Sequence, residues 1–529
     1  MTIWTRRQAL GAGTAAATTA LLGLPLHALA QAARGGVLVI GTTQKPRHLN
    51  PAVQSGVATM GPGAQLFASP LRMDAQWRPQ PYLAERFELS KDNRSVTLFL
   101  RKDALFHDGR PVTAEDVAFS LQALRDNHPF TSMYGPLHGV TVSDRHTAVV
   151  RLAEPHPALL LALSTPLTPI LPAHVFAGSD LKLHPRNASP VGSGPFRLVE
   201  FKPGEHLVLE RFDRFFLKDQ PRLDRLIFKE YKDPSSLLLA FEAGEVDAVQ
   251  QVSGPEIARM RKAPGVQLIE NAAPAIGTLV WLAFNLKTPK LADARVRQAI
   301  SFAIDRDFII KGLAGGTVKR STGPIGSGSP FYSAEVERYD LNLLKASQLL
   351  DAAGMKPGAD GTRFALEVDC PPGVGSMKAL QEYLKPALAK VGIAVTVRSS
   401  PDFPTWARRV AGQQFEATVD SVANWGDPVI GVHRTWLSSN IRPGVIWSNT
   451  QSYANPKVDE LLAAAAREVD GNKRKAQYKA FQKIVVDDCP VAFLVEASTA
   501  EVWNRRVTNP PRGIWGNTDS LAEVGITKA

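Results

Sequence analysis

The chain has 529 residues, of which 44% are hydrophobic and 21% are charged, a composition typical of globular proteins. One hydrophobic core does not serve a chain of this length, so we expect roughly two to four domains. The net charge of +11 is spread without a Lys/Arg block or an aromatic-interleaved basic stripe, which argues against nucleic-acid binding. An anionic ligand is compatible with this charge but is not implied by it.

The first thirty residues predict an export signal that is cleaved. Arg6 and Arg7 precede an apolar run that ends in Ala28-Leu29-Ala30, an A-x-A cleavage site. The run contains glycine and proline and is shorter than a membrane span. The arginine pair resembles a twin-arginine signal, and ordinary Sec export stays open as the alternative. Removal of this segment lowers the net charge to +9 and leaves no cysteine for a lipid anchor, which indicates a free periplasmic protein.

A short buried strand is expected at Val37 to Gly41, followed by a loop from Thr42 to Gly56. This loop contains two candidate ligand contacts, Arg47 and His48. Solvated loop residues and ligand contacts are equally good interpretations of this pair.

The segment from Ser95 to Leu124 predicts a strand, a turn and a helix. Apolar side chains alternate from Ser95 to Arg101, which is the period of a strand. Turn-forming residues follow at 107–111, and Thr113 stands where a helix N-cap is expected. His107 and Asp108 could suggest a catalytic or metal pair, but a metal site needs further ligands. A structural turn is the better interpretation.

The middle of the chain predicts further strands and helices. Gly192 and Gly194 could form either a tight backbone turn or a phosphate cradle, but no Lys-Ser/Thr follows them, which excludes a P-loop. A single helix is expected from Asp293 to Lys311, with Arg295, Arg297 and Asp305 on a surface ion-pair face. The remaining expected strands are 147–152, 196–201, 207–212, 223–228 and 277–285, and another helix is expected at 235–244.

The last part of the chain predicts an α/β unit. A strand at 364–368, a helix at 379–391 and a strand at 393–397 form a β-α-β pattern, which is typical of a parallel sheet. Cys370 and Cys489 are the only cysteines, and we expect two buried thiols, although an oxidising compartment permits a disulfide. Other helices are expected at 339–354, 455–462 and 474–486, and a closing strand at 491–495.

Three segments resemble the family 5 extracytoplasmic solute-binding proteins, which are the peptide-, dipeptide- and nickel-type receptors of ABC importers. They read L-R-K-D-A-L-F-H-D-G-R-P-V-T-A-E-D-V-A-F-S at 100–120, D-A-R-V-R-Q-A-I-S-F-A-I-D-R at 293–306 and N-P-K-V-D-E-L-L at 455–462. The resemblance extends over nearly the whole mature chain. It implies an α/β fold of the periplasmic-binding-protein type, with two lobes around a ligand cleft and three sub-domains.

The resemblance also implies domain boundaries. The first domain is expected to be discontinuous. Its three segments are 31–75, 190–275 and 500–529, the second domain is 76–189 and the third is 276–499.

The function implied by the resemblance is that of a periplasmic receptor. It would bind a peptide or peptide-like solute by hinge closure and deliver it to membrane ABC permease subunits, as a monomer and without a cofactor. A metal chelate or another small organic solute is the alternative ligand. An exported hydrolase is the alternative class, but no G-x-S-x-G, H-E-x-x-H or S-x-x-K set with its partner motifs occurs, and no Cys/His spacing indicates a metal site.

The candidate ligand residues follow from the family's loop after the strand that begins near Phe415. Peptide-binding members have an aspartate three residues before a D-P or E-P pair, where it binds the ligand's α-ammonium. In this chain that position is Asn424, ahead of Asp427-Pro428. An amide cannot form the ion pair, so either Asp427 replaces it or the ligand is not an ordinary peptide. The aromatic candidates for ligand or core contacts are Trp425, Phe403 and, more weakly, Trp281.

Overall fold

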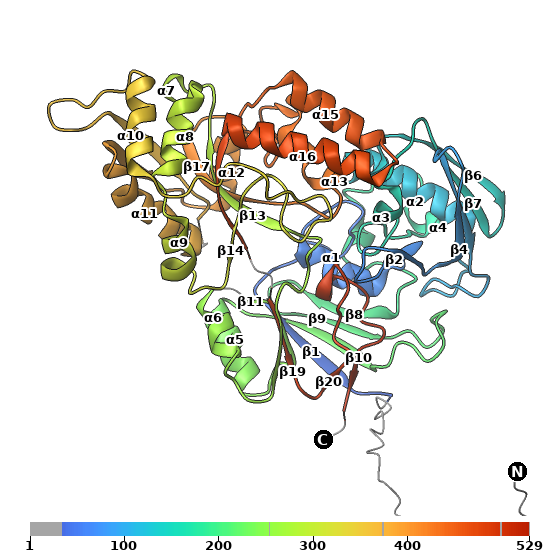
Figure 1. Ribbon diagram of the computed structural model, residues 1–529. Coiled ribbons are helices and arrows are strands. Elements are labelled where there is room, and N and C mark those ends of the chain that lie inside the picture. Colours follow the sequence, from blue (N-terminus) through green and yellow to red (C-terminus); the bar gives the residue numbers. More distant parts are fainter. Residues whose placement is uncertain (1–33, 253, 373–374, 498–499, 528–529) are drawn as a thin grey trace, which may run out of the picture.

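The fold is described from a computed structural model, which covers residues 34–252, 254–372, 375–497 and 500–527. The export signal expected at 1–30 lies outside the described residues. Three large sheets organise these residues, and helices pack around them (Figure 1). In the described ranges, no helix is both long enough and apolar enough to span a bilayer.

The seven-stranded sheet lies at the bottom of Figure 1 and combines three distant parts of the chain. Its order is β12-β19-β11-β1-β10-β9-β8, with β1 parallel to β10 and β11 and the other neighbours antiparallel. Helix α5 (Pro234–Glu242) contributes Leu237 and Phe241 to the cluster on one side of it. The strands are β1 (Val37–Thr42), β8 (Phe196–Lys202), β9 (His206–Arg211), β10 (Arg225–Glu230), β11 (Ala248–Val252), β12 (Val266–Ile269) and β19 (Ala500–Asn504).

A four-stranded antiparallel sheet lies beside it, in the order β4-β5-β7-β6. Val96, Leu98 and Leu100 are buried, as the alternation predicts. Helix α2 (Ala114–Asn127) begins after Thr113, whose amide donates to the Asp116 carboxylate at 2.9 Å, which confirms the predicted helix start. The strands are β4 (Ala84–Leu89), β5 (Ser95–Leu100), β6 (Leu137–Asp144) and β7 (Thr147–Leu152).

The six-stranded sheet has the order β14-β18-β13-β17-β15-β16. Strands β15 and β16 are parallel and connected by α11 (Gly375–Ala389), which confirms the predicted β-α-β unit. Helices α15 (Pro456–Arg467) and α16 (Gly471–Asp488) lie side by side at the top of Figure 1. The strands are β13 (Thr278–Phe284), β14 (Lys319–Arg320), β15 (Phe364–Asp369), β16 (Ile393–Arg398), β17 (Ala417–Ala423) and β18 (Val491–Glu496).

The single helix expected from Asp293 to Lys311 is wrong. The structure has α8 (Ala294–Phe302), the short α9 (Arg306–Phe308) and a π-helical turn at Ile309–Leu313. The break occurs because the Asp305 carboxylate accepts a hydrogen bond from the Phe308 amide and starts a new helix.

The surface ion-pair face expected on this helix is wrong for Arg297. Its side chain is buried and donates to main-chain carbonyls, including those of Cys489 (2.9 Å) and Leu291 (2.8 Å). Arg295 does make an exposed ion pair, with Asp293 at 2.6 Å. Arg297 therefore holds α8 against the segment before β18.

Gly192 and Gly194 lie against the end of α1 (Val57–Leu66), a helix that the sequence did not predict. The Gly194 amide donates to the Leu66 carbonyl at 2.9 Å, and a Cβ atom on either glycine would overlap the end of α1. His107 fastens the same turn, because its half-buried ring donates to the Gly194 carbonyl at 3.1 Å. The 107–111 turn is therefore structural, as expected.

The chain crosses from the seven-stranded to the six-stranded sheet between β12 and β13, and returns between β18 and β19. The expected domain boundaries remain a prediction. The strands of the three sheets come from 37–269 with 500–504, from 84–152, and from 278–496. Cys370 and Cys489 are both free and buried, as expected.

Candidate functional site

One edge of β17 lacks a strand partner over most of its length. On one side, β13 pairs with the whole strand from Ala417 to Ala423. On the other side, β15 pairs only with Ala417 and Thr418. From Val419 onward, no strand of the described chain covers this edge. Alternate N–H and C=O groups that face it can therefore pair with an added extended segment.

A buried carboxylate lies on this open edge. Asp420 is 6% exposed, and its Oδ1 accepts hydrogen bonds from the Ser421 amide at 2.7 Å and from the Trp447 indole at 3.4 Å. Burial raises the pKa of Asp420 to about 7, against the opposing effect of these hydrogen bonds. Aspartate is uncommon in a strand, so a carboxylate at this position is a signal that sequence reasoning could have used.

Arg434, on the short helix α14 (His433–Trp436), is linked to Asp420 through Trp447. Its Nε donates to the Trp447 carbonyl at 2.7 Å. Its guanidinium lies over the ring of Phe130, 5.4 Å from the ring centroid. Burial lowers the pKa of Arg434 to about 10, although Asp420 opposes the shift.

Phe130 belongs to the other side of the molecule, in the segment after α2. The Trp425 ring also packs on it, with 5.2 Å between ring centroids. An ion pair of 3.3 Å between Arg467 and Glu154 joins the same two parts of the chain. The loop after β17 therefore lies where the part containing the six-stranded sheet meets the part containing the four-stranded sheet.

Asn424 organises the chain around it. This residue is 4% exposed, its Oδ1 accepts from the Gly326 amide at 2.7 Å and its Nδ2 donates to the Pro324 carbonyl at 3.2 Å. Its own amide donates to the Ile276 carbonyl at 2.8 Å. The carboxamide thus fastens the loop at 324–326 to the crossover that precedes β13.

Asp427 forms a buried ion pair with Arg474, and each carboxylate oxygen accepts from one guanidinium nitrogen at 2.7 Å. It also accepts from the Val429 amide at 3.0 Å, at the start of α13 (Pro428–Gly431). Burial acts to raise the pKa of Asp427, but Arg474 reverses that effect and holds it below the usual value. In this conformation, Arg474 already binds both oxygens that could anchor a ligand.

The other aromatic candidates lie in different environments. Trp281 is 3% exposed and packs edge-on against Trp436 and Phe493 in the hydrophobic core. Phe403, at the start of α12 (Phe403–Ala411), is 40% exposed and packs against Trp447 at 5.8 Å. Phe403 thus packs on Trp447, whose indole donates to Asp420, whereas Trp281 is a core residue.

Arg47 and His48 lie in the loop that follows β1 of the seven-stranded sheet. Arg47 is exposed, and His48 is half-buried with its Nδ1 accepting from the Asn50 amide at 3.2 Å. A hollow beside the start of this loop is lined by Thr42, Gln44 and Gln250, among others. Neither Arg47 nor His48 lines it.

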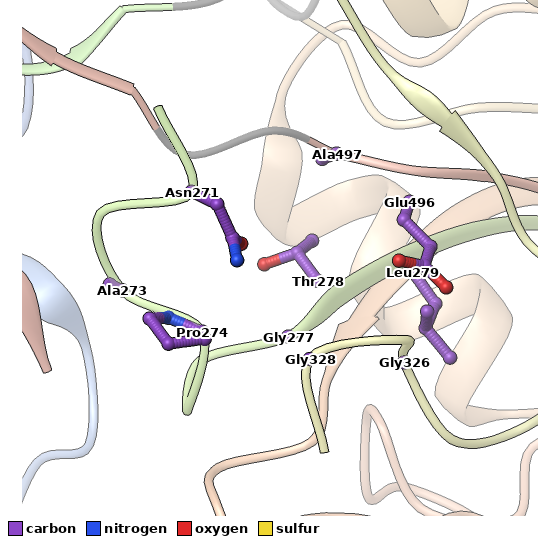
Figure 2. Close-up of a pocket in the computed structure, with 10 residues that line it drawn as sticks. All are labelled: Asn271, Ala273, Pro274, Gly277, Thr278, Leu279, Gly326, Gly328, Glu496 and Ala497. Atoms are coloured by element: carbon purple, nitrogen blue, oxygen red, sulfur yellow. The ribbon is translucent and has the colours of Figure 1, made fainter. Parts of the chain in front are cut away.

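A small cavity lies at the crossover behind Asn424 (Figure 2). Gly277 and Gly326, which contact Asn424, form part of its wall. In Figure 2 the side chains of Asn271 and Thr278 point toward one another across it. The cavity adjoins both crossovers, since its lining residues are Asn271, Ala273, Pro274, Gly277, Thr278, Leu279, Gly326, Gly328, Glu496 and Ala497.

No metal-binding cluster of three or more His, Cys, Asp or Glu side chains occurs among the residues that the structure describes. The open edge of β17 is thus surrounded by the buried Asp420, by Arg434 and by a set of aromatic rings.

Comparison with known protein families identifies the family of this chain. The model for bacterial extracellular solute-binding proteins, family 5 (Middle) matches residues 78–449. The chain belongs to this family. Family 5 membership agrees with the sequence resemblance and with the two-lobed, periplasmic-binding-protein type of fold.

Individual relatives of this family 5 protein match most of its length. The dipeptide-binding protein of Escherichia coli (strain K12) is 25% identical over 455 residues, which cover 81% of this chain and 82% of that protein. The Bacillus subtilis oligopeptide-binding protein AppA, solved with a nonapeptide, has a TM-score of 0.80 and 22% identity, and covers 94% of this chain and 100% of its own. NikZ from Campylobacter jejuni, solved with Ni(L-His), has a TM-score of 0.80 and 24% identity, with 92% and 97% covered.

Proposed function

We propose that this family 5 protein is the periplasmic substrate receptor of an ABC importer and binds a peptide or peptide-like solute. The observation that carries this proposal is the open edge of β17 from Val419 to Ala423. An extended ligand can add to such an edge as a further strand, with hydrogen bonds to the main chain that do not depend on its side chains. Peptide ligands in the names of relatives support the same ligand class.

The mechanism we propose is binding followed by closure around the two crossovers. Contacts across the lobes are already present in this structure, between Phe130 and Trp425 and between Glu154 and Arg467. A solute held at the β17 edge would bridge the two sides and favour the closed form, which the permease subunits would receive. In this proposal the protein is a monomer without catalytic activity, exported by a cleaved N-terminal signal of the twin-arginine or Sec type.

A metal chelate or another small organic solute is the second candidate ligand. It is favoured by the loop itself, because Asn424 is neutral and Asp427 is bound on both oxygens by Arg474. An α-ammonium group therefore has no free carboxylate at these two positions. The name of the NikZ complex provides a precedent for a chelate among proteins of this fold.

Native mass spectrometry of protein purified gently from the periplasm tests these alternatives. A ladder of bound masses that fits short peptides supports the peptide receptor, and a single non-peptide mass supports the second candidate. Empty protein would be screened by thermal shift, since a ligand at a hundred times its Kd adds about 2.7 kcal/mol of stability. Catalytic turnover of a bound compound would overturn the receptor function.

A further inference from the structure

We propose that Arg434 is the anchor for a carboxylate group of the bound solute. This inference rests on the proposed function and specifies its ligand: an anionic solute, such as a peptide bound through its C-terminus. It follows from the hydrogen bonding of Arg434, from its position at the β17 edge, and from the state of the other charged residues there.

The guanidinium of Arg434 is only partly used by the protein. Within the described part of the chain, it makes one hydrogen bond, from Nε to the Trp447 carbonyl, and no ion pair within 4.0 Å. Its two terminal nitrogens therefore remain available on a half-buried cation, and neither is sealed away from the accessible surface. A planar guanidinium of this kind binds a carboxylate through two parallel hydrogen bonds.

The position of Arg434 connects it to the open strand edge. Trp447 accepts from Arg434 through its carbonyl and donates to Asp420 through its indole, and Asp420 in turn binds the Ser421 amide on β17. The guanidinium also lies over Phe130, where the two lobes meet. An extended solute along β17 can therefore reach it. Asn424 follows Asp420 by four positions, which is about 13 Å at 3.3 Å per residue and matches the length of a tripeptide or tetrapeptide.

The surrounding charges favour an anion. Asn424 is neutral, and Arg474 occupies both oxygens of Asp427. Asp420 is the acid whose charge acts on Arg434, although the two form no ion pair within 4.0 Å. Burial raises the pKa of Asp420 to about 7, which favours its neutral form more than in an ordinary aspartate and weakens its compensation of Arg434.

Affinities for end-capped peptides test this inference on the full mature chain, stripped of solute by reversible unfolding. The probes are one tripeptide and tetrapeptide library prepared with free ends, with an N-acetyl cap and with a C-terminal amide, and occupancy is measured by native mass spectrometry. We expect the N-acetyl forms to bind within about threefold of the free forms, and the amides to bind at least about tenfold more weakly. Arg434→Gln should bind acids and amides equally, and Arg434→Lys should keep part of the preference.

Arg408→Gln is the matched control, because Arg408 is exposed on α12 of the same lobe, and it should keep the full preference for free acids. Equal binding of acids and amides by the wild type, or unchanged binding of acids by Arg434→Gln, would overturn the carboxylate anchor and leave the receptor function intact. If no library member binds, the peptide ligand fails, and the solute that co-purifies decides the role of Arg434. A solute without a carboxylate, or the absence of any bound or stabilising carboxylate compound, would then overturn the inference.

Discussion

At the scale of single residues, the polar side chains of the loop after β17 largely hold the loop itself in place. Asn424 binds the segment at 324–326, and Asp427 binds Arg474 and caps α13. The Asp427–Arg474 pair is buried on both sides, with 8% and 5% of the two side chains exposed. Loss of one partner would leave an uncompensated buried charge. We therefore expect substitutions of this pair to lower the stability of the fold, whatever their effect on ligand binding.

Substitution of Arg474 by methionine is expected to lower the free energy of unfolding by about 3–5 kcal/mol, because it leaves the Asp427 carboxylate buried without a partner. The measurement is urea unfolding followed by circular dichroism. Lys483→Met on the same helix is the control, since Lys483 pairs with Asp487 at the surface and should cost less than about 1 kcal/mol. Equal losses in the two variants would contradict the structural role of the pair.

At the scale of elements, the sequence predicts what local periodicity encodes. The bounds of β7 and the start of α2 agree with the prediction, because alternation and capping are local features. The helix expected at 293–311 breaks at Asp305, a local N-cap that the prediction overlooked, and the buried Arg306 then donates to the distant Phe493 carbonyl. The role of the loop at Asn424 in ligand binding, which the family resemblance implies, stays a prediction.

The rest of the candidate site depends on contacts between distant residues. Phe130, Asp420, Arg434 and Trp447 come together only after the sheets are packed. Trp281 is a ligand candidate in the sequence because it lies on a strand beside the loop. Alternate side chains of a strand point to opposite faces, and that of Trp281 points into the hydrophobic core. Strand periodicity predicts which residues share a face of the sheet, but it does not predict which of the two faces is in the core.

Gly192→Ala tests the close approach between the 190–196 turn and α1. The added methyl group would overlap the Leu66 carbonyl, so we expect a loss of about 1–3 kcal/mol. Gly139→Ala is the control, since Gly139 on β6 has open space around its Cβ position and should change stability by less than about 0.5 kcal/mol. Thermal unfolding by calorimetry compares them, and equal melting temperatures would show that α1 moves aside without cost.

At the scale of the whole molecule, the two sides touch near the proposed site, where Trp425 and Ile430 pack into the same hydrophobic cluster as Phe130. Phe130 is central among them, because it packs against both Trp425 and Arg434. A receptor that closes on its solute needs such contacts to be weak enough to open. Their strength therefore sets how much of the binding free energy is used for closure.

Phe130→Ala is expected to favour the open form of the unliganded protein and to weaken solute binding by about 5- to 30-fold, since it removes both ring contacts. Small-angle X-ray scattering should show a larger radius of gyration for this variant than for the wild type. The control is Phe308→Ala, because Phe308 is 46% exposed and stacks on Tyr383 away from this contact. An unchanged radius and affinity in Phe130→Ala would exclude this residue from closure.

The position of β19 has a consequence for biosynthesis. Residues 500–504 pair with both β11 and β12, which precede them by more than two hundred positions. During translation, β11 and β12 are synthesised before β19 and therefore lack this pairing partner until residues 500–504 have been added. The seven-stranded sheet is consequently the last of the three large sheets that can be completed, and until then its unpaired edges are open to other nascent chains and to chaperones.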